Sequence, residues 1–136
     1  MRTAALCYSR ALAEFDYGDD HPFKPIRARS TLELCHMYGL THAVGLLQPT
    51  PKPAELAEVE RFHTAEYIDA LRRASAGTLD LSNGPLFGIG TQDCPALPGI
   101  WEFSLLATGA TLECVRLVMD GSVERALKLV EAQQQG

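Results

Sequence analysis

The spacing of apolar residues along the chain predicts short buried strands that alternate with helices. Residues 3–8 and 43–48 are short apolar runs near turn residues, a pattern typical of buried strands. Helical spacing covers residues 25–38, about 53–63, and 64–73. Strands separated by helices pair in parallel through right-handed crossovers. The pattern therefore predicts an α/β fold that is rich in helices and has few strands.

Capping residues set the expected limits of these helices. Pro25 suits a first helical position, Gly39 suits a C-terminal stop, and Thr64 is placed as an N-cap. We expect residues 9–24 to form a long loop. The inward stripe of the helix at 25–38 is expected to be Ile26, Ser30, Leu34 and Met37 or Tyr38.

The helix expected at 99–119 is the most apolar segment of the chain. A helix that is apolar on most sides is buried on most sides, so we expect a homo-oligomer that buries this helix or an exposed sheet edge. Glycine in mid-helix costs roughly 1 kcal/mol relative to alanine, and Gly109 therefore predicts close backbone packing. The preceding segment, 77–99, holds five glycines and three prolines, which is typical of a functional or disordered loop.

The C-terminal segment 122–133 has the local features of a helix. Ser122 is a good N-cap, and Val123, Ala126, Leu127 and Val130 share the spacing of one helix face. Alternate residues Leu127 and Leu129 also fit a strand, so both structures stay open, with helix favoured.

Composition narrows the possible partners. The chain has 136 residues, enough for one domain spanning 1–136, and its net charge of -5 argues against nucleic-acid binding. No apolar run approaches the roughly 20 residues that cross a membrane. No signal peptide is visible, so we expect a cytoplasmic protein without membrane or nucleic-acid partners. The cysteines have no C-x-x-C spacing and are expected to be buried free thiols: Cys7, Cys35, Cys94 and Cys114.

One loop combines a turn, an imidazole, two prolines and two cations before a helix. It reads Tyr17-Gly18-Asp19-Asp20-His21-Pro22-Phe23-Lys24-Pro25-Ile26-Arg27. This stretch resembles the first loop of the histone deacetylase family, which includes acetoin-utilisation and acetylpolyamine deacetylases. Three later stretches resemble further motifs of that family in the same order: residues 61–68, Asp93-Cys94-Pro95 with Gly99-Ile100, and residues 106–111.

The resemblance implies a fold, an activity and roles for particular residues. The implied fold is the N-terminal portion of an arginase/deacetylase-type parallel sheet. Asp93 would accept hydrogen bonds from substrate amides at the pocket rim, and Pro22 would form part of the wall. Arg27 would line an inner cavity that holds acetate, with Tyr17 and His21 beside it. For Asp93 the alternative is a loop cap, and for Arg27 a surface ion pair.

The family's metal-binding motifs have no counterpart here. The sequence has no His-His pair, and its one Asp-x-His lies at residues 19–21, in the first loop. We assign no catalytic residue and no metal ligand, and expect zinc only in a full-length family member.

Two functions remain open. The first is an enzyme portion, truncated before the metal-binding motifs and inactive alone, whose complete form hydrolyses acetyl-lysine or another acetylated amine. The second is a non-catalytic module that associates with itself or with a partner through its exposed apolar face.

Overall fold

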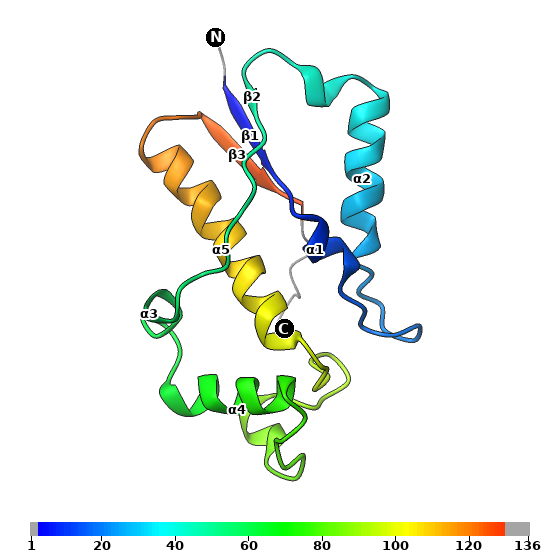
Figure 1. Cartoon of the computed structure of the whole chain (residues 1–136), viewed down its shortest axis with the longest axis vertical. Coiled ribbons are helices and arrows are strands. Elements are labelled where there is room, and N and C mark those ends of the chain that lie inside the picture. The colour runs from blue at the N-terminus through cyan, green and yellow to red at the C-terminus, as the bar shows by residue number, and fades with distance from the viewer. Residues whose placement is uncertain (1–2, 130–136) are drawn as a thin grey trace.

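A small parallel sheet with helices on both faces forms the centre of the computed structural model, which describes residues 3–129 (Figure 1). Its strand order is β2 (Leu46–Leu47), β1 (Ala4–Cys7), β3 (Arg125–Lys128). The α-helices are α1 (Arg10–Glu14), α2 (Ile26–Met37), α3 (Leu56–Val59), α4 (Ala65–Ser75) and α5 (Ile100–Met119). Two 3-10 turns, η1 (Leu40–His42) and η2 (Gly84–Phe87), complete the described part. The predicted α/β class is confirmed.

The alternation of side chains along β1 explains why both faces of the sheet are covered. Successive strand residues point to opposite faces. Ala5 packs with Leu117 of α5 and with Val123. Leu6 packs on the other face, with Ala28 of α2 and Leu129. Helices α5 and α2 therefore lie on opposite sides of the sheet (Figure 1).

The C-terminal segment forms a strand, so the helix that local reasoning favoured over 122–133 was wrong. β3 pairs in parallel with β1, with Ala126 opposite Ala5 and Leu127 opposite Leu6. Leu129 N donates to Cys7 O at 2.9 Å just beyond the strand. Helix propensities differ by less than about 0.7 kcal/mol per residue, and the open edge of β1 offers hydrogen bonds that outweigh them. Residues 130–133 of the predicted helix lie outside the described residues.

Four other predictions in the N-terminal half were wrong in part. The strand expected at 43–48 is limited to β2, and the helix expected at about 53–63 is limited to α3. The expected loop at 9–24 contains α1, whose Leu12 and Ala13 are buried. Helix α2 has nearly the predicted limits, and Gly39 follows it with φ of 72°. Its buried residue is Ala28. The predicted inward residues Ile26, Leu34, Met37 and Tyr38 are exposed. The reason is that only one narrow strip of α2 meets the three-stranded sheet.

Helix α4 begins where its sequence predicts. Thr64 has extended backbone and its Oγ1 accepts a hydrogen bond from Tyr67 N at 3.3 Å. This N-cap fixes the helix so that Ile68, Leu71 and Ala74 face inward. α4 packs across the start of α5, at the end away from the sheet (Figure 1).

Because Gly109 has no side chain, the backbone of a loop crosses α5 in direct contact with the helix backbone, as predicted. A Cβ added at Gly109 would lie 1.8 Å from Lys52 O and 2.8 Å from Ala54 N. Ala54 N donates to Leu105 O of the helix at 2.8 Å. The segment between β2 and α3 is thus fastened to the middle of α5 by a contact that no side chain could enter.

Within the single chain, the C-terminal half of α5 is not buried on most sides, and its burial in a homo-oligomer stays a prediction. Ile100, Trp101, Ala110 and Leu117 are buried, but Val115 is 51% exposed and Met119 80% exposed. Within residues 3–129, the sheet and the 51–54 crossing cover only part of the circumference of this helix. An apolar strip on α5 therefore faces outward.

Replacing Gly109 by alanine should destabilise the fold despite the gain in helix propensity. The new methyl group would displace the Lys52–Ala54 backbone, and overpacking of this kind typically costs about 1–3 kcal/mol. Urea unfolding measures the change in free energy. The control is Val115→Ala, which also raises helix propensity but at an exposed position, and it should be neutral or stabilising. A more stable Gly109→Ala variant would contradict the close crossing.

Candidate functional site

Aromatic rings of the first loop anchor the largest core cluster. The rings of Tyr17 and Phe23 meet edge to face with centroids 4.8 Å apart, and the ring of Phe15 stacks on Phe103 of α5 at 4.5 Å. Tyr17 and Phe23 share this core with α4 and the start of α5. Burial of these rings holds the loop against α4 and α5.

Polar contacts within the loop hold its shape. Lys24 Nζ donates to Gly18 O at 2.9 Å and to Asp19 O at 2.7 Å. Gly18 has φ of 92°, a conformation that favours glycine, and its N donates to Asp16 Oδ1 at 2.8 Å. The lysine of the motif thus closes the loop on itself, and the loop presents its remaining side chains in fixed directions.

His21 lies inside this loop with one ring nitrogen unsatisfied. Its Nδ1 accepts a hydrogen bond from Phe23 N at 3.0 Å, so the neutral ring carries its proton on Nε2. Among the described residues, Nε2 is buried without a hydrogen-bond partner. The ring lies 4.8 Å from that of Tyr17. An orphaned buried N–H costs about 1–3 kcal/mol, which makes it a donor ready for a small ligand or water.

Burial also changes the acidity of two tyrosines near this loop. It raises the pKa of Tyr17 to about 12, with a smaller contribution from Cys94. Burial likewise raises the pKa of Tyr67, again with Cys94 nearby. Both phenols therefore stay protonated at neutral pH and can donate hydrogen bonds.

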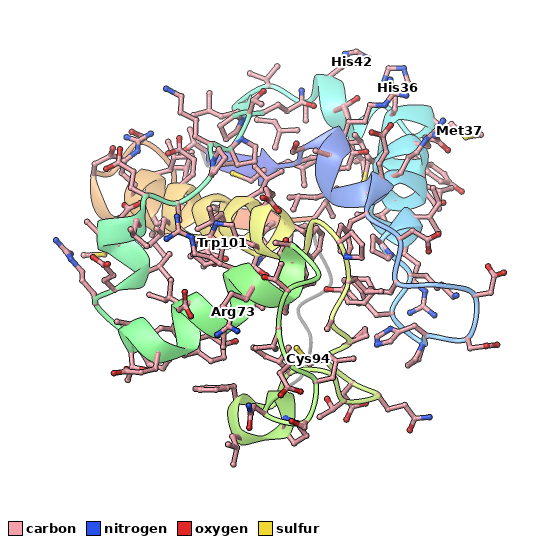
Figure 2. All side chains as sticks on the ribbon, turned by 60° about the horizontal axis from the view of Figure 1, so that its bottom comes forward. His36, Met37, His42, Arg73, Cys94 and Trp101 are labelled. Carbon is pink, nitrogen blue, oxygen red and sulfur yellow. The ribbon has the colours of Figure 1, made fainter. Side chains whose placement is uncertain are left out.

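A groove of about 410 Å³ runs along α5 beside α4. Tyr17 and Cys94 line it, and so do residues of α4 and α5. Cys94 comes from the long loop and Trp101 from the start of α5 (Figure 2). Its full lining is Tyr17, Phe23, Val59, Phe62, His63, Tyr67, Ile68, Leu71, Cys94, Ile100, Trp101, Phe103, Ser104, Leu105, Ala107, Thr108, Thr111 and Lys128.

A tight turn holds Asp93 next to Cys94, which lines the groove. Gly90 N donates to Cys94 O at 2.8 Å, and Cys94 N donates to Thr91 Oγ1 at 3.1 Å. The turn directs Cys94 into the groove lining and leaves its neighbour Asp93 exposed. A carboxylate in this place can reach a molecule that approaches from solvent.

The structure brings together only some of the predicted site residues. Tyr17 and His21 are in ring contact in the core of the loop. Arg27 lies on the first turn of α2, where its N donates to Lys24 O at 3.0 Å, and the residue is exposed. Pro22 and Asp93 are also exposed. Their roles in substrate and acetate binding stay predictions.

Sequence reasoning missed the polar groups that α4 and β3 add to the groove. The rings of His63 and Tyr67 stack with centroids 4.8 Å apart, and both line the groove. His63 precedes the N-cap of α4 and Tyr67 lies in its first turn, and the available signal was that both belong to the family-like stretch 61–68. Lys128 was missed because it lies on the segment for which a helix was favoured.

The described residues hold no group of three or more His, Cys, Asp or Glu side chains that could bind a metal ion. His36 and His42 project from the end of α2 and from η1, far from α4 and the long loop (Figure 2). The four cysteines are free, as expected, but the expected burial holds only for Cys7, because the other three are partly exposed. Residues 3–129 also contain no helix long and apolar enough to cross a membrane.

Comparison with known families decides the affiliation of the chain. A family model of the histone deacetylase domain matches residues 21–133. The chain belongs to the histone deacetylase family. Its three-stranded α/β arrangement agrees with part of such a domain.

Individual relatives agree with this affiliation. The chain is 31% identical to the acetoin utilization protein AcuC of Bacillus subtilis (strain 168) over 129 residues, which are 95% of this chain and 33% of that protein. It is 33% identical to the histone deacetylase RPD3 of Saccharomyces cerevisiae, with 82% of this chain and 26% of the relative aligned. For histone deacetylase HDAC1 of Drosophila melanogaster the identity is 32%, over 90% of this chain and 21% of the relative. The chain therefore spans about a third or less of the relatives it matches.

The raised pKa of Tyr17 makes stability depend on alkaline pH. Below pH 10 the phenol is neutral in both the folded and the unfolded protein, and its contribution to the free energy of unfolding is complete. As the pH rises from 10 to about 12, the unfolded state ionises first and stability falls, by about 1–2 kcal/mol from this group. Tyr17→Phe should lose less stability over that range, as measured by urea unfolding at pH 9 and pH 12.

The matched control for this titration is Tyr38→Phe, since Tyr38 is 78% exposed. This variant should lose as much stability between the two pH values as the unaltered chain. An equal pH dependence for Tyr17→Phe and the unaltered chain would contradict the buried, protonated phenol.

Proposed function

We propose that this chain supplies the substrate rim and part of the inner-cavity wall of a deacetylase that hydrolyses acetyl-lysine or another acetylated amine. The observation that carries the proposal is the first loop, which places Tyr17 in the groove lining and His21 in ring contact with Tyr17. The family affiliation supplies the reaction class. The chain alone is expected to be inactive, and its expected location is the cytoplasm.

Asp93 supports the rim assignment through its position. The turn at 90–94 holds it next to the groove, on a segment that is joined directly to the start of α5. A carboxylate there can accept two amide N–H bonds from an extended peptide, which fixes the peptide's direction as well as its distance. Pro22 presents an exposed, rigid surface on the neighbouring loop, suited to forming a wall.

His21 supports the cavity assignment through its unsatisfied nitrogen. Its buried Nε2–H can donate to a carboxylate such as acetate, and the protonated Tyr17 beside it can donate a second bond. Arg27 would add a charge that is present at every pH. These donors bind and orient a small acid, but none of them can activate water.

The expected zinc ion does not fit the residues described here, since they provide no set of three ligands. In a longer family member zinc would polarise the acetamide carbonyl and activate the attacking water. We therefore assign no step of hydrolysis to residues 3–129.

A chimera tests the proposed function. Residues 1–129 would replace the matching part of the yeast histone deacetylase RPD3, and the product would be assayed on an acetyl-lysine peptide. We expect turnover by the chimera, and neither turnover nor one-to-one zinc for the present chain alone. Asp93→Ala should lower kcat/KM of the chimera about ten- to hundredfold, the effect of losing hydrogen bonds to a charged group.

The control is Asp20→Ala, which removes an exposed carboxylate from the first loop. This variant should keep its activity. A folded, zinc-loaded chimera without activity, or an Asp93→Ala chimera with full activity, would overturn the proposal. So would tight one-to-one zinc and turnover in the present chain.

A second function, self-association without catalysis, is favoured by the exposed apolar side chains. Met119 and Val115 on α5 are 80% and 51% exposed. Phe62, just before α4, is 87% exposed, and Val44, just before β2, is 81% exposed. Apolar surface spread over these elements would be covered by association.

Association should depend on the outward strip of α5. Sedimentation velocity at micromolar concentration should show a dimer or larger species. Val115→Glu with Met119→Glu should shift the population to monomer, because charges at a contact would have to lose their hydration. Glu substitution of Thr31, an exposed residue on α2, is the control and should change little. A clean monomer of the unaltered chain rules this function out.

A further inference from the structure

Lys128 is a cation held against the face of α5. Its Nζ donates to Thr111 Oγ1 at 2.8 Å and to Ala107 O at 3.4 Å. It occupies the last position of β3, opposite Cys7 in the register, so its side chain points to the α5 side of the sheet. An ammonium has three N–H donors, and these contacts engage two of them.

Lys128 gives one end of the groove a charge that the rest of the lining lacks. Among the described residues that line the groove, it is the one Lys, Arg, Asp or Glu. The other lining side chains are largely aromatic and aliphatic, including Phe103 and Trp101. The groove therefore combines a single positive charge with a long apolar wall.

The surroundings of Lys128 leave its charge poorly solvated. Burial lowers the pKa of Lys128, although the nearby Cys114 acts in the opposite direction. The two oxygens that accept its hydrogen bonds are uncharged. An anion placed against Nζ would compensate this charge, because charge-assisted hydrogen bonds are stronger than neutral ones.

We propose that the groove binds a monocarboxylate with a long apolar tail, its carboxylate on Lys128 Nζ and its tail along α5 toward Trp101. The distance along α5 from Ile100 to Thr111 is roughly 16 Å at the rise of an α-helix, which favours an elongated tail. The groove volume of about 410 Å³ lies within the usual range for small-molecule sites.

Charge and chemistry select this class of ligand over others. One lysine offers no bidentate fork for a phosphate, and the net charge of -5 repels multiply charged anions. A neutral tail alone would leave the ammonium without a counter-charge while removing water from it. Lys128 and Thr111 would position the carboxylate of the ligand, and neither residue belongs to the proposed rim or inner cavity.

Decanoate and 1-decanol, which have tails of equal length, test the proposal. Trp101 is the one tryptophan of the chain and lines the groove, so its fluorescence reports occupancy. Titration should give saturable binding of decanoate and clearly weaker binding of decanol. Lys128→Met keeps an apolar stem without the charge and should weaken decanoate about ten- to hundredfold. Lys128→Arg should retain part of the affinity.

Lys52→Met is the matched control, since it makes the same substitution at an exposed lysine outside the groove lining. It should bind decanoate like the unaltered chain. Equal binding of decanoate and decanol, equal binding by Lys128→Met, an equal loss in Lys52→Met, or no binding would each overturn the proposal. If Lys128→Met does not fold, the decanoate and decanol comparison decides alone. None of these outcomes depends on deacetylase activity.

Discussion

The parallel pairing of β1 with β3 is the constraint on which the rest of the structure depends. It joins residues 4–7 to residues 125–128, so every other element must fit into the connection between them. A parallel pair cannot be closed by a short turn and needs a crossover that packs on the sheet. The alternation of β1 then assigns α5 to one face through Ala5 and α2 to the other through Leu6.

The crossovers bring the first loop to the start of α5. The contact between this loop and the helix forms one side of the groove. Phe15 and Tyr17 pack on Phe103, and the turn at 90–94 enters α5 beside them. At the other end, β3 carries Lys128 to Thr111 of the same helix. In the proposed function the loop would contribute to a deacetylase-type substrate site, while the strand adds a cation that the family motifs do not account for. Both depend on α5, whose middle is fixed by the crossing at Gly109.

Sequence reasoning succeeded where a residue acts through its own backbone or a recognisable motif. Thr64, Gly39 and Gly109 have local effects and were placed correctly. Sequence reasoning failed where the structure of a segment depends on contacts with residues far away in the chain. The segment 122–133 has the residues of a helix, and only the edge of β1 makes part of it a strand. The exposed stripe of α2 followed from the small width of the sheet, which no local pattern reveals. For the candidate site, the motif singled out Tyr17 and His21, whose roles stay predictions, and the unsatisfied Nε2 of His21 and the position of Lys128 required coordinates.

The β1–β3 pairing is tested most directly by NMR of the backbone over residues 122–129. The structure predicts strand-type Cα and Cβ shifts at 125–128, slow exchange of the Leu129 amide, which donates to Cys7 O, and cross-strand contacts between Ala5 and Ala126. Helical shifts over 122–129, with no contact to residues 4–7, would contradict the account: β3 would be absent, and Lys128 would not be held against α5.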